Sequence, residues 1–122
     1  LDLRASGEEC LASMEDASVD VVFTVSVLDH LPEPEPVFVE LARIARTALI
    51  LLEPFTGRVG RSDGEAGSAD PHNVLTSIPF SYTWDYVALS RKLAGSWRWR
   101  WVPYPLSSGN MGPYYWLIEG TK

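Results

Sequence analysis

Two short, almost continuous apolar segments constrain this sequence more than any other feature. Residues 19–25 read VDVVFTV and residues 48–52 read ALILL. Short apolar runs of this kind are typical of strands buried on both faces, as strands are in parallel sheets. Between them, Val37, Leu41 and Ile44 repeat at helical spacing. The order strand, helix, strand therefore predicts two adjacent parallel strands, with helices on both faces of the sheet.

Two further helices are predicted around these strands. The capping-box pattern at Ser6 and Glu9 predicts a short helix that runs to about Met14 and buries Cys10. The second helix is expected over residues 83–94, with an acidic residue in its first turn, basic residues in its last turn and a glycine directly after it. Cys10 is expected to be a core residue, because no histidine lies near it in the sequence to activate its thiol.

The C-terminal part adds two strands that have no helix between them. They are expected at residues 96–102 and 114–119, and the link over residues 103–113 is too short for an ordinary crossover, so the two strands should pair antiparallel. Residues 53–80 are rich in glycine, serine and aspartate and are expected to form a long loop. The predicted fold is one α/β domain over residues 1–122, with parallel strands followed by a C-terminal antiparallel hairpin.

The composition restricts the functional classes. The formal net charge of -6 argues against a nucleic-acid backbone or an anionic membrane as a partner. A single cysteine allows no disulfide within the chain, which favours a reducing, cytoplasmic compartment. No apolar run reaches the roughly 18 residues of a membrane-spanning helix. The sequence starts in the middle of a pattern and without methionine, so we expect it to be a piece of a longer protein.

Four segments of the N-terminal half follow one another in a family-specific order. They are residues 16–22, in which acids precede valines, residues 25–31 (VSVLDHL), residues 37–46 with the stretch ELARI, and residues 49–54, which end in Glu-Pro. Together they resemble class I S-adenosylmethionine-dependent methyltransferases, and the rest of the chain agrees in the order of its elements. The resemblance implies a partial Rossmann-like sheet, methyl transfer as the activity and S-adenosylmethionine as the cofactor.

The resemblance also implies where the cofactor would bind. The family's glycine-rich loop after strand one and its ribose-binding acid after strand two have no counterpart in this sequence. Asp2 and Leu3 resemble the third-strand segment whose acid receives the adenine amino group, and Ser26 and Val27 are expected to lie close to the cofactor through their backbone. With strands one and two absent, residues 19–25 would form an exposed edge, which a missing N-terminal half of the domain or a partner chain is expected to cover.

Residues that follow the strands are the candidates for a substrate pocket, because ligands of open α/β sheets bind beyond the carboxyl ends of the strands. His30 is a candidate base or a structural hydrogen-bonding residue, and Glu53 binds a polar substrate group or anchors the following loop. Four aromatic residues near the hairpin link form an aromatic wall of the pocket or belong to the core: Tyr104, Tyr114, Tyr115 and Trp116. A small-molecule acceptor is expected, and no metal, since the polar cluster at residues 70–73 lacks a second spaced histidine.

Residues 97–101 read WRWRW, which places three tryptophans on one face of a strand and two arginines on the other. One interpretation is a stacking platform for bases or sugars. The other is an edge strand whose indoles pack beneath the helix of residues 83–94, which the negative net charge favours. Two alternatives to an enzyme therefore stay open: a non-catalytic methyltransferase-like binding or partner domain, and a module that binds carbohydrate or nucleic acid.

Overall fold

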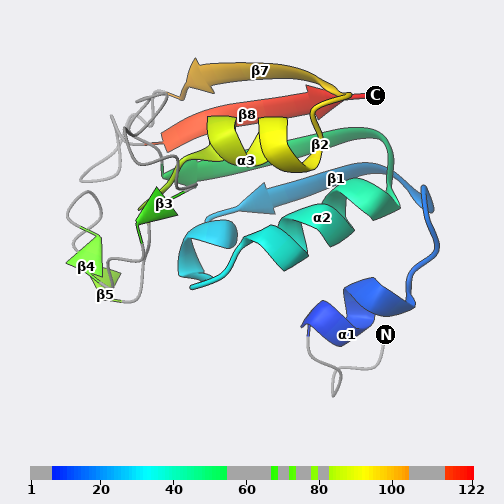
Figure 1. Cartoon of the computed structure of the whole chain (residues 1–122), viewed down its shortest axis with the longest axis horizontal. Helices are drawn as coiled ribbons and strands as arrows, with labels where there is room; N and C mark the ends of the chain where they lie inside the picture. Colours follow the sequence, from blue (N-terminus) through cyan, green and yellow to red (C-terminus); the bar gives the residue numbers. More distant parts are fainter. Residues whose placement is uncertain (1–6, 55–66, 69–71, 74–77, 80–82, 105–114) are drawn as a thin grey trace.

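A mixed four-stranded sheet and three helices form the main part of the structure (Figure 1). The computed structural model describes residues 7–54, 67–68, 72–73, 78–79, 83–104 and 115–122. Its main elements are α1 (Gly7–Ser13), β1 (Val19–Val25), the 3-10 helix η1 (Leu28–His30), α2 (Glu35–Ile44), β2 (Ala45–Pro54), α3 (Tyr86–Leu93), β7 (Arg98–Pro103) and β8 (Tyr115–Thr121). Four two-residue strands accompany them: β3 (Gly67–Ser68), β4 (His72–Asn73), β5 (Ile78–Pro79) and β6 (Thr83–Trp84).

The order of the strands in the sheet is β1-β2-β8-β7. β1 and β2 run parallel, with Val22 opposite Leu49 and Thr24 opposite Leu51. β8 is antiparallel to both β2 and β7, which lie on either side of it. The predicted α/β fold, with a parallel pair and a C-terminal antiparallel hairpin, is therefore confirmed. β2 is longer than the predicted strand at residues 48–52, because it begins directly where α2 ends.

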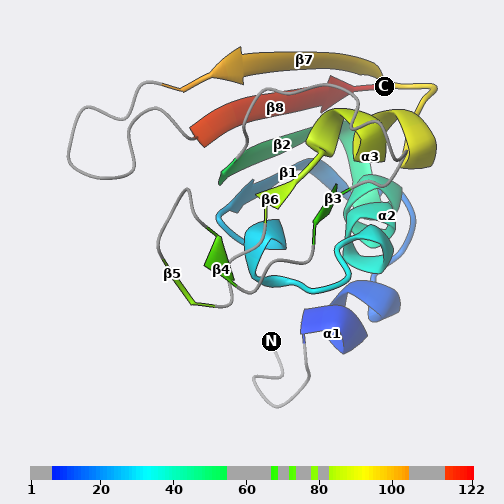
Figure 2. The same ribbon diagram turned by 60° about the vertical axis from the view of Figure 1, so that its left-hand side comes forward.

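All three helices lie on the same face of the sheet in both views of the ribbon (Figures 1 and 2). The prediction of helices on both faces is therefore wrong for the described part of the chain. The reason is the handedness of crossover connections, which is right-handed in nearly all proteins. The chain passes from β1 through α2 to β2, and then through α3 to β7, always advancing across the sheet in one direction. Each crossover consequently places its helix on the same side.

β1 is buried on one face only. Val22 and Thr24 face the helices and are 8% and 7% exposed, whereas Phe23 on the opposite face is 61% exposed. Val21 and Val25 share that open face and are each 47% exposed. The prediction of a strand covered on both faces is therefore wrong here, because the helices cover one side alone. β1 is also an edge strand: within the described ranges, β2 is its single hydrogen-bonded neighbour.

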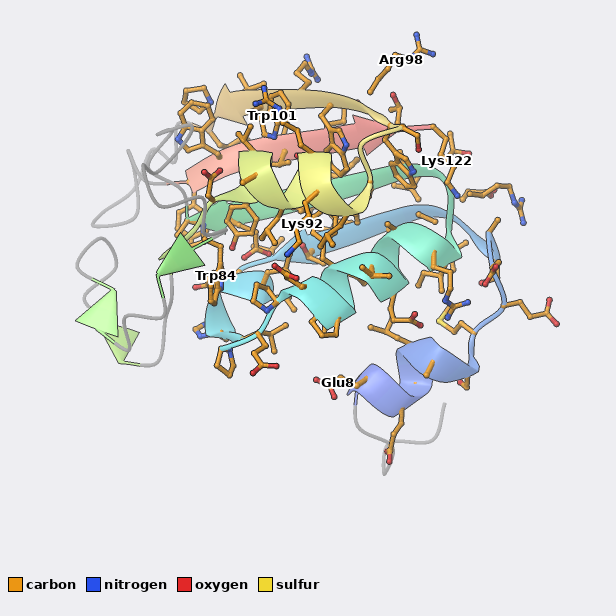
Figure 3. All side chains as sticks on the ribbon, viewed as in Figure 1. Glu8, Trp84, Lys92, Arg98, Trp101 and Lys122 are labelled. Carbon is orange, nitrogen blue, oxygen red and sulfur yellow. The ribbon has the colours of Figure 1, made fainter. Side chains whose placement is uncertain are left out.

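The tryptophans of β7 and of the residues before it pack beneath the helices. The ring of Trp99 lies 5.8 Å from that of Phe38 and stacks on Trp97 at 5.9 Å, and its Nε1 donates to the carbonyl of Ala94 at 2.9 Å. Arg98 projects away from the ribbon at the start of β7 (Figure 3). The indoles therefore serve the core beneath α2 and α3, as the packing interpretation of the WRWRW segment expected.

Gly120 is required by this packing, since it lies directly opposite Trp99 in the sheet. A Cβ atom added at Gly120 would come within 2.5 Å of the Trp99 ring. Because the indole is held by its stacking contacts, we expect Gly120→Ala to lower the free energy of unfolding by about 1–3 kcal/mol, measured by urea denaturation. Gly7→Ala is the control, because no atom of the described residues lies within 4 Å of its added Cβ. Equal losses in both variants would contradict the proposed clash.

α3 begins later than the sequence predicted. Residues 83 and 84 form β6, and the helix starts at Tyr86 instead of residue 83. Asp85 is the N-cap, and its side chain accepts a hydrogen bond from the backbone N–H of Ala88 at 3.0 Å. Aspartate is among the residues that best satisfy the free N–H groups of a helix start, so the helix begins immediately after it. The acidic residue expected inside the first turn is therefore the cap itself.

α1 is attached by the partly buried side chain of Leu11, which packs against the core, and by hydrogen bonds from α2. No residue of α1 is buried and Cys10 is half-buried, so the expectation that this helix buries Cys10 in the core is wrong. The guanidinium of Arg43 on α2 donates to the carbonyl oxygens of Leu11 at 2.9 Å and Met14 at 2.8 Å. Ser6, the expected N-cap of this helix, lies outside the described residues.

Candidate functional site

The carboxyl ends of β1 and β2 lie at the same edge of the sheet, because the two strands run parallel. Directly after β1 the chain reverses at Ser26, which has a left-handed backbone with φ of 49°, and continues into η1. Residues other than glycine rarely adopt this conformation. The backbone N–H of Ser26 donates to the carbonyl of Leu52 at 2.9 Å, which ties the start of the turn to β2. We call residues 26–30 the β1 turn.

Glu53 of β2 holds the β1 turn by hydrogen bonds from the buried side of the turn. Its side chain is fully buried, and its Oε1 accepts hydrogen bonds from Thr24 Oγ1 and from the backbone N–H of Val27, both at 3.1 Å. Its Oε2 accepts from the backbone N–H of Asp29 at 3.3 Å. One carboxyl group near the end of β2 thus connects this strand with residues on both sides of Ser26. Contact between Glu53 and a substrate stays a prediction.

A hydroxyl pair connects the β1 turn to β8. Ser26 Oγ donates to Asp29 Oδ1 at 3.0 Å and lies 3.1 Å from the hydroxyl of Tyr115, with which it shares a hydrogen bond. Asp29 is 1% exposed and Tyr115 is 2% exposed. Sequence reasoning named Tyr115 as part of an aromatic wall or of the core, and did not select Asp29 or Thr24. An acid inside the apolar segment 25–31 was the available signal for Asp29, whereas the contact between Ser26 and Tyr115 joins residues far apart in the chain.

Burial dominates the electrostatics of this cluster. It raises the pKa of Glu53 to about 7, and the nearby negative charge of Asp29 adds to the effect, while hydrogen bonds from Val27 and Thr24 oppose it. Burial likewise raises the pKa of Tyr86 well above its usual value, with further contributions from the charges of Glu53 and Asp29. Two carboxyl groups therefore share a dry site, and Glu53 changes its charge close to neutral pH.

His30 lies on the solvent side of the same turn. Its imidazole is 48% exposed, and Nε2 lies 3.8 Å from Asp29 Oδ2, an ion pair when the ring is protonated. Val27 is also exposed, at 43%. Tyr104 follows the end of β7, is 41% exposed, and donates its backbone N–H to the carbonyl of Tyr115 at 2.9 Å. The structure therefore brings His30, Val27 and Glu53 together, and places Tyr104 farther along the same edge.

Trp84 is buried against η1, the 3-10 helix of the β1 turn. Its Nε1 donates to the carbonyl of Leu28 in η1 at 3.1 Å, and its side chain is 8% exposed (Figure 3). The site residues Asp2, Leu3 and Tyr114 lie outside the described residues, as do Asp70 and most of the expected loops at residues 53–80 and 103–113. Glu53 and Pro54 belong to β2 rather than to a loop.

No group of three or more histidine, cysteine, aspartate or glutamate side chains among the described residues is arranged to hold a metal ion. None of the helices in the described ranges is long and apolar enough to cross a membrane.

Comparison with known proteins gives two matches to methyltransferases. Residues 3–51 match the sequence model of a methyltransferase domain (Methyltransf_11). The crystal structure of a SAM-dependent methyltransferase from Thermotoga maritima, described as a possible histamine N-methyltransferase, matches with a TM-score of 0.54 and 18% sequence identity. The match covers 90% of this chain and 59% of that one. No curated protein sequence matches this chain significantly.

The two matches agree with the architecture. The matched residues 3–51 include β1, α2 and most of β2, which carry the parallel pair and the β1 turn. The structural match covers 90% of the chain and so reaches well beyond the parallel pair. This chain spans little more than half of the matched structure. On these grounds the chain has part of a class I methyltransferase fold.

Proposed function

We propose that this chain is part of an S-adenosylmethionine-dependent methyltransferase that transfers a methyl group to a small-molecule acceptor. The β1 turn is the observation that carries the proposal. It lies at the carboxyl ends of two parallel strands, where open α/β sheets bind their ligands, and it falls within a methyltransferase fold. The negative net charge supports a small molecule over a nucleic acid as the acceptor.

The charges behind the β1 turn fit the proposed cofactor. S-adenosylmethionine carries positive charge on its sulfonium and on its amino group. Asp29 and Glu53 are buried carboxyl groups directly behind Ser26 and Val27, so their negative potential would attract a cation at the surface of the turn. Ser26 and Val27 are therefore proposed to contact the cofactor. Asp2 and Leu3 stay proposed cofactor contacts from the sequence.

The chain's own contribution to the chemistry is position and proton transfer. When bound, the cofactor supplies an electrophilic methyl group, and the protein has to align the acceptor with it and exclude water. His30 is proposed to accept the proton of an acceptor that has to lose one, because its exposed imidazole lies beside the buried carboxyl group of Asp29. Glu53, Tyr104 and Tyr114 are proposed to border the substrate pocket.

A further polypeptide segment is proposed to cover the edge and the open face of β1. Three apolar side chains on that face, Val21, Phe23 and Val25, are about half exposed or more. Strand edges of this composition pair readily with other chains. The covering segment is either the N-terminal half of a complete domain or a partner chain. The greater length of the matched methyltransferase supports this proposal.

Calorimetric titration with S-adenosylmethionine tests the proposed function. We expect weak binding by this chain, with a Kd of about 1 mM, because part of the pocket is proposed to lie on the covering segment. Ser26→Ala should weaken binding severalfold, since it removes the hydroxyl that joins Asp29 to Tyr115. Ser13→Ala is the matched control, because Ser13 lies on α1 and donates to the carbonyl of Cys10 on the same helix at 2.8 Å.

If the folded chain bound no S-adenosylmethionine even at a cofactor concentration well above the expected Kd of about 1 mM, the proposal would be withdrawn for this chain. This result would favour a non-catalytic methyltransferase-like domain instead. Equal losses in Ser26→Ala and Ser13→Ala would argue that the cofactor binds elsewhere than at the β1 turn.

A further inference from the structure

We propose that Glu53 is a positioning residue whose ionised carboxylate fixes the β1 turn in the conformation that receives the cofactor, and that proton uptake by this carboxyl group loosens the turn. The inference rests on the proposed function only in naming the cofactor as the ligand of the turn. The hydrogen bonds and the burial of Glu53 carry the rest, and they are independent of any ligand.

The bonding pattern of Glu53 shows why the carboxylate matters. Three of the groups that donate to it flank the left-handed residue Ser26: Thr24 precedes it, and the N–H groups of Val27 and Asp29 follow it. Hydrogen bonds to an ionised acceptor are shorter and about twice as strong as neutral ones. A protonated carboxyl group carries an O–H on one of its oxygens, and this O–H cannot pair with the N–H donors of Val27 and Asp29. Proton uptake therefore weakens the bonds that hold Val27 and Asp29.

The groups around Glu53 favour a change of charge near neutral pH. Asp29 of η1 is buried beside it, Tyr86 faces it from α3, and Tyr115 approaches from β8. With burial as the main cause, the pKa of Glu53 lies at about 7. His30 also lies at the turn, with Nε2 3.8 Å from Asp29 Oδ2.

Amide proton shifts measure the state of the turn directly. We expect the N–H signals of Val27 and Asp29 to move together with a common midpoint near pH 7, over a titration from about pH 5.5 to about pH 8.5. Glu53→Gln should abolish this transition. His30→Asn should leave it in place, which separates Glu53 from the nearby imidazole. Transitions that survive in Glu53→Gln, or that disappear in His30→Asn, would overturn the inference.

The His30→Asn protein also serves if Glu53→Gln does not fold, because it keeps the native carboxyl group. Both amide signals must then still titrate near neutral pH. Flat signals for Val27 and Asp29 in a folded His30→Asn protein would show that Glu53 does not control the turn.

Cofactor affinity supplies a second, functional readout. If only the ionised form of Glu53 holds the receptive turn, the affinity for S-adenosylmethionine should be about tenfold lower at pH 6 than at pH 8, and independent of pH in Glu53→Gln. Binding by the wild type that does not change with pH would overturn the inference. No binding at any pH would instead remove the proposed function, and the amide titration would still decide the role of Glu53.

Discussion

Replacing Glu53 by alanine should lower the free energy of unfolding by about 2–3 kcal/mol at neutral pH. The substitution leaves the N–H groups of Val27 and Asp29 and the hydroxyl of Thr24 without their acceptor, inside or beside the core. A buried donor that loses its partner costs about 1–3 kcal/mol, and the space left by the side chain adds to the loss. Urea denaturation of the wild type and the variant measures the difference.

Glu119→Ala is the matched control for this substitution. Glu119 lies on β8 and pairs with Arg100 across the sheet, and both side chains are partly exposed. An exposed ion pair contributes about 0–1 kcal/mol, so the control should be close to the wild type. A loss in Glu53→Ala no larger than in Glu119→Ala would show that the buried hydrogen bonds are not what holds the β1 turn.

The stability of the folded chain should fall as the pH rises from about 4.5 to about 7, by on the order of 3 kcal/mol from Glu53 alone. In this window the folded state keeps a proton on Glu53, whose pKa is about 7, while the unfolded chain has already released it from a carboxyl group with an ordinary pKa of 4.5. The unfolded state therefore binds fewer protons, and stability declines with rising pH until Glu53 is ionised in both states.

Urea midpoints at a series of pH values measure this dependence. The slope should be absent or strongly reduced in Glu53→Gln, whose side chain has no charge to lose. His30→Asn should keep most of the slope, although removal of its imidazole changes the contribution of the ion pair with Asp29. Stability that rises from pH 5 to pH 7 in the His30→Asn protein would contradict the raised pKa of Glu53.

The hydrogen bonds that Glu53 accepts and the free-energy cost of its ionisation act in opposite directions on stability. The ionised carboxylate holds the β1 turn most firmly, yet ionisation in a buried position costs stability. Strained or destabilised groups of this kind are common where a protein binds its ligand. Ser26, with its left-handed backbone, is a second instance in the same turn.

Much of the sheet was predictable because strands and helices leave periodic patterns in the sequence. The apolar segments at residues 19–25 and 48–52 predicted the parallel pair of strands, and the helical repeat between them predicted α2. The short link before residue 114 gave the antiparallel hairpin. The alternation of WRWRW gave the face on which the indoles pack. Each of these signals is local, so one stretch of sequence was sufficient to interpret it.

The features that the sequence did not predict depend on how distant segments meet. The coverage of β1 on one face follows from the direction in which the crossovers advance, which no property of residues 19–25 reveals. The role of Glu53 as an acceptor for Val27 and Asp29 depends on the register between β1 and β2. The contact between Ser26 and Tyr115 joins residues 89 positions apart. Residue type alone could only suggest Glu53, Ser26 and Tyr115 as site residues, without showing which groups they contact.

Mapping the binding of S-adenosylmethionine by amide chemical shifts tests the central claim most directly. The account predicts that the largest shift changes on addition of the cofactor fall on Ser26, Val27 and their neighbours in the β1 turn, while α1 and the outer strand β7 stay unchanged. Changes concentrated on α1 or β7, or no changes at all in the folded protein at several millimolar cofactor, would contradict it.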